Sequence, residues 1–171
     1  MVKLDEFRQK LASGGFRGNQ YRVSIPFPSF AISGDAETSL QFLCIASSIP
    51  GQKINAISVK YRGQTIKIAG DKEPAAAWSV DVYNSKSFDI RKTLEAWHNY
   101  YIEQDAITGQ NMMPVVDATV EALDKNDNVL STYTMYNLWP TEIAEIELTQ
   151  ESENKISTFK TTFEFDYWKA S

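Results

Sequence analysis

One cysteine and one histidine are the only residues of their kinds in this chain, which leaves little for metal or redox chemistry. A structural zinc or iron–sulfur site typically takes about four nitrogen or sulfur ligands at close spacing, and Cys44 and His98 cannot provide them. A single cysteine also cannot form an intrachain disulfide, so the fold does not depend on an oxidising compartment. The sequence therefore predicts no metal site and no cofactor.

The chain also lacks a surplus of positive charge. Its 17 lysine and arginine residues stand against 22 aspartate and glutamate residues, which gives a formal net charge of -5. Proteins that grip nucleic acid usually carry a basic surplus, because the neutralisation of phosphates drives that binding. An acidic protein instead discourages DNA from adsorbing, since like charges repel. The composition argues against a nucleic-acid-binding protein but suits one past which DNA has to move freely.

Long hydrophobic runs are missing too. No stretch approaches the roughly 20 apolar residues of a membrane span, and charged residues stand near the start, where a signal peptide has an apolar run. We therefore expect a protein that is made in the cytoplasm and does not insert into a membrane. A chain of this length with 43% hydrophobic residues can bury one core, and we expect a single domain over residues 1–171.

A catalytic constellation is absent as well. His98 has no nucleophile or orienting carboxylate in a motif around it, and a hydrogen-bonded or solvated position on a helix flank explains it better. Cys44 lies in an apolar stretch, which favours a buried and unreactive thiol. Asp124, Asp127 and Asn128 resemble a calcium loop without its glycine and distal glutamate, so a hairpin turn fits better. We predict that the protein is not an enzyme.

The first segment with helical periodicity is short. Leu4, Phe7 and Leu11 share one face of residues 4–12, and a Ser-Gly-Gly sequence then ends the helix. A helix of this length is not stable in isolation. We therefore expect its apolar face to dock, either on its own subunit or on a neighbour.

A longer helix is expected over about residues 88–102. Its apolar residues recur at helical spacing and form one stripe that faces a core. The stripe consists of Ile90, Leu94, Trp97 and Tyr101. Polar residues cover the opposite side, so this helix should lie on the surface and flank the rest of the fold.

Alternation of apolar and polar residues predicts strands through most of the remaining chain. The expected strands cover residues 21–25, 39–46, 54–61, 64–68, 78–82, 116–122, 129–136, 143–148 and 156–168, and Leu138-Trp139-Pro140 is expected to separate two of them. Many short strands with one substantial helix predict a mainly β fold. We expect an antiparallel β-sandwich or barrel with one flanking α-helix and a short N-terminal helix.

The strands at 54–61 and 64–68 are expected to form a hairpin around Arg62-Gly63. On it, Ile57, Val59 and Tyr61 should share one face with Ile66 and Ile68. A basic group surrounds this hairpin: Lys53, Lys60, Arg62, Lys67 and Lys72. An acidic group lies near the last turn: Glu142, Glu145, Glu147, Glu151 and Glu153. The two groups fit complementary faces of a head-to-tail contact between copies, but an ordinary surface of mixed charge explains them equally well.

Several motifs together resemble a known family. The most specific part is Leu138-Trp139-Pro140-Thr141 followed by Asp166-Tyr167-Trp168. Supporting motifs are Ser48-Ile49-Pro50-Gly51 leading into Tyr61-Arg62-Gly63, then Ile68-Ala69-Gly70-Asp71, and the helix start Phe88-Asp89-Ile90-Arg91-Lys92. Over nearly the whole chain, this pattern resembles the tail tube proteins of contractile-tailed bacteriophages.

The resemblance implies a structural protein whose copies form six-fold rings stacked into a hollow tube. It implies that the tube belongs to the virion tail, is assembled in the host cytoplasm, and lets the genome pass through its lumen without specific binding. The implied partners are further copies of the chain, the tail sheath protein, the tape measure protein, and the baseplate and tail terminator proteins.

The family's motifs also imply where rings would stack, namely along Lys53 to Gly70 and the N-terminal segment, and the charge pattern adds two acidic residues. The expected interface residues are Lys53, Lys60, Tyr61, Arg62, Gly63, Lys67, Phe7, Leu11, Glu145 and Glu147.

Three alternatives stay open at this point. Related proteins form the inner tubes of type VI secretion systems and phage-tail-like bacteriocins, although the phage-like motifs favour the tail tube. A small-ligand-binding β-barrel would work as a monomer and would contain an apolar cavity. An enzyme is disfavoured by the missing constellation.

Overall fold

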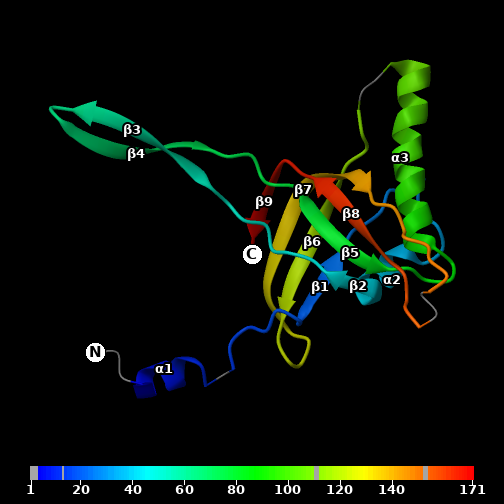
Figure 1. The fold of residues 1–171 in the computed structure, drawn as a ribbon, viewed down its shortest axis with the longest axis horizontal. Coiled ribbons are helices and arrows are strands. Elements are labelled where there is room, and N and C mark those ends of the chain that lie inside the picture. The colour runs from blue at the N-terminus through cyan, green and yellow to red at the C-terminus, as the bar shows by residue number, and fades with distance from the viewer. Residues whose placement is uncertain (1–3, 13, 110–111, 152–153) are drawn as a thin grey trace.

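The computed structural model describes residues 4–12, 14–109, 112–151 and 154–171, and one antiparallel sheet dominates it (Figure 1). Seven strands form this sheet, in the order β1-β6-β7-β8-β5-β2 with β9 paired to β7. They are β1 (Tyr21–Ser24), β2 (Cys44–Ala46), β5 (Trp78–Tyr83), β6 (Val116–Leu123), β7 (Val129–Ile143), β8 (Thr158–Glu164) and β9 (Tyr167–Ala170). A second sheet consists of β3 (Ile54–Tyr61) and β4 (Gln64–Lys72). The helices are α1 (Leu4–Lys10), α2 (Ala36–Leu43) and α3 (Asp89–Thr108).

The large sheet curls until its two ends approach each other. β1 and β2 stand at opposite ends of the strand order, yet the Tyr21 hydroxyl in β1 donates to the carbonyl oxygen of Cys44 in β2 at 3.4 Å. The sheet is therefore nearly closed and barrel-like. The predicted mainly β, antiparallel fold with a flanking helix is confirmed.

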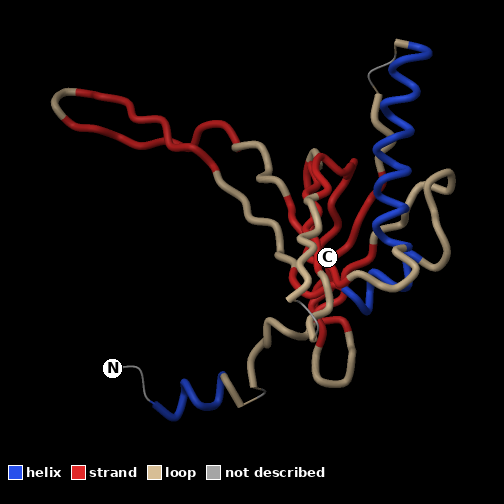
Figure 2. Tube along the Cα trace, turned by 45° about the vertical axis from the view of Figure 1, so that its right-hand side comes forward, coloured by secondary structure: helices blue, strands red, loops and turns tan. Residues whose placement is uncertain are grey.

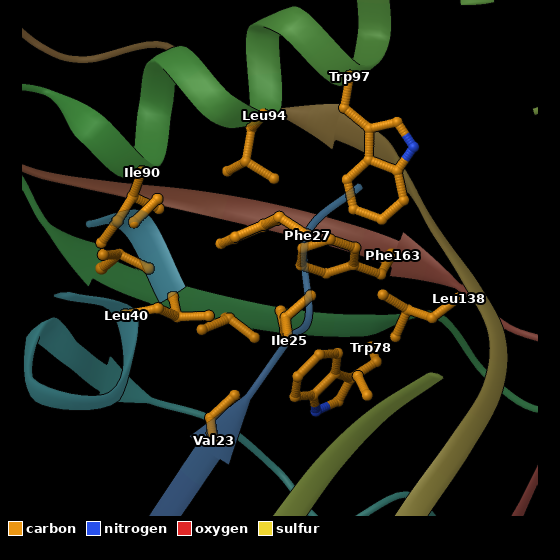
Figure 3. Close-up of a cluster of buried hydrophobic side chains, with 14 of the residues drawn as sticks. Val23, Ile25, Phe27, Leu40, Trp78, Ile90, Leu94, Trp97, Leu138 and Phe163 are labelled. Atoms are coloured by element: carbon orange, nitrogen blue, oxygen red, sulfur yellow. The ribbon is translucent and has the colours of Figure 1, made fainter. Parts of the chain in front are cut away.

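Helix α3 covers the core along one side of the sheet (Figure 3). Ile90, Leu94 and Trp97 are at most 3% exposed and pack with residues of the sheet, whereas Tyr101 is half-buried. The Trp97 indole donates to the carbonyl oxygen of Pro114 at 2.9 Å and so satisfies its one polar group inside the core. The predicted stripe is confirmed, and the helix continues to Thr108, past its predicted end at residue 102.

Helix α2 corrects the prediction of a strand over residues 39–46. Ala36 and Leu40 are buried and Leu43 packs against the core, a spacing of four and three residues that matches a helical face. Phe42, which the strand prediction placed with Leu40, is 81% exposed. Only residues 44–46 are extended, as β2.

Strand β7 corrects a second prediction, because the chain does not break at Leu138-Trp139-Pro140. Asn137 adopts a left-handed conformation with φ of 57° and bends β7 without ending it. Its backbone N–H donates to Asp117 at 3.1 Å and its side-chain amide to Asp166 at 2.6 Å, which holds the bend. Pro140 then pairs with Phe163 in β8, at the edge of a register shift where its missing N–H is tolerated.

The last predicted strands also differ in detail. Residues 144–148 do not form the predicted strand: β7 ends at Ile143, and Leu148 is 88% exposed. The predicted strand 156–168 is divided into β8 and β9, which run along the two halves of β7. The Asp166 N–H donates to the carbonyl oxygen of Tyr136 at 3.1 Å, opposite the bend of β7. One corner of the barrel is therefore built from Asn137 and Asp166 together.

Two parts of the chain extend away from this body (Figures 1 and 2). One is the hairpin arm, which we define as residues 54–72, the strands β3 and β4 with their turn. The other is α1, in which no residue is buried. Both predicted elements are confirmed, and both place apolar side chains outside the core.

Candidate interaction surfaces

The hairpin arm carries an apolar face that nothing in its own subunit covers. The register pairs Ile57 with Ile68 and Val59 with Ile66, so these side chains lie on one face of the two-stranded sheet. They are 44–50% exposed, and Tyr61 on the same face is 59% exposed. A contiguous apolar face in contact with water is typical of an interaction site. The arm is therefore the strongest candidate for a binding surface among the described residues.

The opposite face of the arm is polar and basic. Ser58 pairs with Lys67 and Lys60 with Thr65, which places both lysines on this second face. Arg62 and Gly63 form the turn with φ of 48° and 81°, the positive values that a tight two-residue hairpin turn requires. The Arg62 guanidinium lies 5.3 Å from the centre of the Tyr61 ring. The structure thus brings the predicted hairpin residues onto one arm. Tyr61 lies on its apolar face, Lys60 and Lys67 lie on its polar face, and Arg62 and Gly63 form its tip.

The base of the arm is held by contacts within the arm and its flanks. Lys53 forms an ion pair with Glu73 at 2.8 Å, and the Glu73 N–H donates to the Lys53 carbonyl oxygen at 2.9 Å. At Gly70 a side chain would meet the Asn55 carbonyl oxygen at 2.8 Å, so a glycine is required at the irregularity of the β3–β4 register. Lys53 therefore has a role inside the subunit, and its place at an interface stays a prediction.

Helix α1 and Leu11 directly after it present a second uncovered apolar face. Leu4, Phe7 and Leu11 are 64%, 56% and 48% exposed. A seven-residue helix gains too little from its own hydrogen bonds to be stable without packing. Phe7 and Leu11 thus have the exposure that a contact with another molecule would use, as predicted for them.

The described part of the acidic group lies on and after the end of β7, on the other side of the body from the arm (Figure 1). Glu142, Glu145, Glu147 and Glu151 are exposed, and Glu153 lies outside the described residues. Glu145 and Glu147 line a shallow depression together with Asp81, Lys155 and Lys160. The arm and this acidic region face away from each other, so a contact between them within one subunit is excluded by the geometry.

An open cleft of about 780 Å³ lies between α3 and β7. Tyr101, Ile102, Met113 and Trp139 contribute apolar surface to it, and Asp166 contributes a negative charge. The ligand-binding barrel considered above requires a cavity within the sheet. Here the interior of the sheet is filled by core side chains such as Trp78, Leu138 and Phe163, which are at most 2% exposed.

His98 and Asp124, which were considered as catalytic or metal-binding residues, form hydrogen bonds within the fold. His98 Nε2 lies 2.9 Å from the carbonyl oxygen of Pro140, and it must donate there because a carbonyl oxygen only accepts. The Asp124 carboxylate accepts a hydrogen bond from the Asn128 side chain at 3.0 Å, which is the main cause that lowers its pKa, and the backbone N–H groups of Asn128 and Asn126 at 2.9 and 2.7 Å add to the shift. Within the described residues no group of three or more potential metal ligands is found, and no described helix is long and apolar enough to cross a membrane.

The Cys44 thiol has the properties of a protonated, structural side chain. Burial is the main cause that raises its pKa from 9.0 to about 11, repulsion from Asp81 adds to the shift, and a hydrogen bond with Tyr21 partly opposes it. Between pH 9.0 and about 11 the folded state therefore keeps a proton that the unfolded state loses. Stability is consequently greatest below this window and falls as the pH rises through it.

Replacing Cys44 by serine is expected to remove this loss of stability, because a serine hydroxyl does not ionise in the same range. The free energy of unfolding in urea should be measured for both proteins at about pH 7.5 and about pH 10.5. The unaltered protein should lose more stability between the two pH values than Cys44→Ser does. An equal loss in the two proteins would contradict the assignment.

Sequence reasoning missed part of these surfaces. The alternation in 54–61 and 64–68 correctly gave the shared face of Ile57, Val59 and Ile66, and the resemblance implied a contact along Lys53 to Gly70. Because such a pattern normally means burial against a core, the individual arm residues expected at an interface were only the basic ones, Tyr61 and Gly63. The lysines on the opposite face do not reveal this, because a strand packed on a core also has a charged face toward solvent.

Comparisons with known proteins agree with one another. The family described as "Phage tail tube protein" matches residues 16–171. The chain is 28% identical to a tail tube protein of Serratia phage KSP90, over 99% of this chain and 97% of that protein. It is 27% identical to the tail tube protein gp19 of Enterobacteria phage T4, over 97% of this chain and 99% of that protein.

Similar folds occur in solved contractile injection systems. The tube-terminating cap of the anti-feeding prophage aligns with a TM-score of 0.65 and 14% identity, over 92% of this chain and 91% of that one. A chain of the PVC sheath–tube complex in its extended state aligns with a TM-score of 0.59 and 16% identity, over 100% of this chain and 99% of that one. At these identities the likeness concerns the fold.

Proposed function

The chain belongs to the phage tail tube protein family, and from this premise we propose that its copies assemble into hexameric rings that stack into a hollow tube. The tube forms in the host cytoplasm and becomes part of the virion tail, and its lumen conducts the viral genome during ejection. Its curated relatives are tail tube proteins of myovirus-type phages, similar along almost their full length, which supports a structural role without catalysis.

The observation that carries this proposal is the contrast between a filled body and an uncovered arm. The core side chains of the barrel, such as Trp78, Leu138 and Phe163, are almost completely buried, while the apolar face of the arm is exposed to water. Covering apolar surface stabilises a contact by about 25 cal/mol per Å². A neighbouring copy that covers Ile57, Val59 and Ile66 would supply this stabilisation. The subunit is in this sense complete only in an assembly.

The arrangement of charges supports a head-to-tail contact. The hairpin arm, which carries Lys60, Arg62 and Lys67, extends from one side of the body, and the segment after β7, which carries Glu145 and Glu147, lies on the other (Figure 1). A contact between two different surfaces of the same molecule closes into a ring or continues along an axis. We assign the arm and the face of α1 with Phe7 and Leu11 to contacts between successive rings, and the two glutamates to the surface that receives the basic side of the arm.

The remaining partners follow from the position of a tube in a tail. A sheath protein would surround it, a tape measure protein would fill its lumen during assembly, and baseplate and terminator proteins would cover its ends. Two solved proteins of similar fold, a tube-terminating cap and a chain of a sheath–tube complex, support such neighbours. The net charge of -5 suits a lumen that DNA crosses without adsorbing.

The inner tube of a secretion system or bacteriocin is the nearest alternative. It shares the architecture, so the fold by itself does not distinguish the two. The curated relatives named above are phage proteins, which favours the phage tail.

Purified protein should form rings or tubes as its concentration rises. Sedimentation velocity should show a shift from single subunits to fast-sedimenting particles, and negative-stain microscopy of the same samples should show hollow rings or tubes of constant width. Particles that stay single and compact at every concentration, and that bind or turn over a small compound, would overturn the proposed function.

A further inference from the structure

Two short stretches, residues 47–53 and 73–77, join the hairpin arm to the body, and the first of them is hydrogen-bonded to the sheet. We define the leading segment as residues 47–53, between β2 and β3. Two carbonyl oxygens of this segment accept hydrogen bonds from tryptophan side chains of the body. The Trp78 indole donates to Ser48 at 2.9 Å, and the Trp168 indole donates to Gly51 at 3.1 Å.

Both indoles come from rigid places in the sheet. Trp78 is 2% exposed, and its ring lies 5.6 Å from that of Phe163. Trp168 is half-buried in β9, where it pairs with Met135 of β7 and its ring lies 5.8 Å from that of Tyr133. An indole N–H has one donor and no acceptor, so each ring fixes one point of the leading segment. With two points held, the leading segment has a defined direction, whereas with one point held it could rotate about that point.

The two strands of the arm move together as a rigid unit. β3 and β4 are paired along their length. At the base of the arm, the Lys53–Glu73 ion pair and the hydrogen bond from the Glu73 N–H join the residue before β3 to the residue after β4. A change of angle in the leading segment is therefore transmitted to the tip, where Arg62 lies. Trp168 is the last anchor before the arm begins, and it belongs to β9, far away in the sequence.

We propose that Trp168 and Trp78 are positioning residues that set the angle at which the hairpin arm leaves the body. Trp168 is the more important of the two for the arm, because its bond to Gly51 lies closer to β3. The angle concerns the isolated subunit and does not depend on the proposed function. Its consequence for ring stacking does rest on that function.

The angle can be measured with two spin labels on the otherwise full chain. Cysteines at Gln64, beside the turn of the arm, and at Asn126, in the exposed turn before β7, would carry the labels in a Cys44→Ser background. Pulsed electron–electron double resonance on the single-subunit fraction should give a narrow distribution of distances between the two labels. In Trp168→Phe, which keeps the aromatic packing and loses the donor, detached orientations of the arm should become about fivefold more populated and broaden the distribution.

Trp97→Phe is the matched control, because it loses the same kind of bond, to Pro114, at a site away from the arm. Its distance distribution should stay narrow. An unchanged distribution in Trp168→Phe, or equal broadening in Trp97→Phe, would overturn the proposal. Trp168 is only half-buried, so Trp168→Phe should fold and can be tested even if Trp78→Phe does not fold. If Trp168→Phe broadens the distance distribution and still forms tubes as well as the unaltered protein, the positioning role stands and the role of the arm in stacking is contradicted.

Discussion

Arg62→Glu combined with Lys67→Glu is expected to abolish tube formation while the subunit still folds. Both side chains are exposed on the arm, so their replacement removes no core contact. In the proposed contact they face the acidic surface of the next copy, and placing like charges together costs several kcal/mol per contact. The penalty recurs at every subunit of a ring. Sedimentation velocity at a concentration where the unaltered protein forms tubes should show only the slow species.

Lys86→Glu combined with Lys125→Glu is the matched control. It makes the same change in net charge at exposed positions outside the arm, so it should still form tubes. Thermal unfolding followed by circular dichroism should be alike in the two variants. Undiminished tube formation by the arm variant, or equal loss in both, would remove the arm's charges from the proposed interface.

Leu94→Ala is expected to cause a large loss of stability without removing a hydrogen bond. Leu94 is 1% exposed beneath the helix, next to Ile90 and Trp97 (Figure 3). Truncating a buried leucine costs about 3 kcal/mol, because transfer energy is lost and a cavity is left. For a domain of this size that corresponds to a fall in Tm of about 6–12 °C.

The same truncation at Ile107 on the same helix provides the comparison. Ile107 is 78% exposed, so Ile107→Ala should change the free energy of unfolding by less than about 0.5 kcal/mol. Thermal and urea unfolding of the two variants would be followed side by side. If both lose the same stability, α3 is not held to the sheet by the side chains assigned to the core.

Much of the fold was accessible from the sequence because strong periodic patterns coincide with burial. The stripe of Ile90, Leu94 and Trp97 predicted α3, and the hairpin around Arg62 and Gly63 was correctly placed. Both succeed for a local reason, since residues close in sequence determine the helical face and the turn.

The errors arise where two local patterns compete or where a distant partner decides. Residues 36–46 contain apolar side chains at both helical and alternating spacing, and the packing of Ala36 and Leu40 on the body selected the helix. At Pro140 the local rule predicted a break, but Asn137 absorbs the bend and β8 supplies pairing on the far side. Neither outcome is encoded within a short window of sequence.

The candidate surfaces were only half predictable for a related reason. Charge can be read from the sequence, so the basic and acidic groups were found. Whether an apolar face such as that of Ile57 and Val59 is covered depends on where the hairpin points. That direction is set by Trp78 and Trp168 through contacts with Ser48 and Gly51, which no local pattern reveals.

The two strands of the arm pair only with each other, so each also has an outer backbone edge without a partner in the described chain. Two free subunits can therefore meet edge to edge and form a dead-end dimer before either reaches a growing tip. Lys60 and Lys67 oppose this pairing, because it brings like charges together. Salt weakens that protection as the screening length falls from about 10 Å at 0.1 M to about 3 Å at 1 M. Stocks of the free subunit are best kept dilute and at low ionic strength.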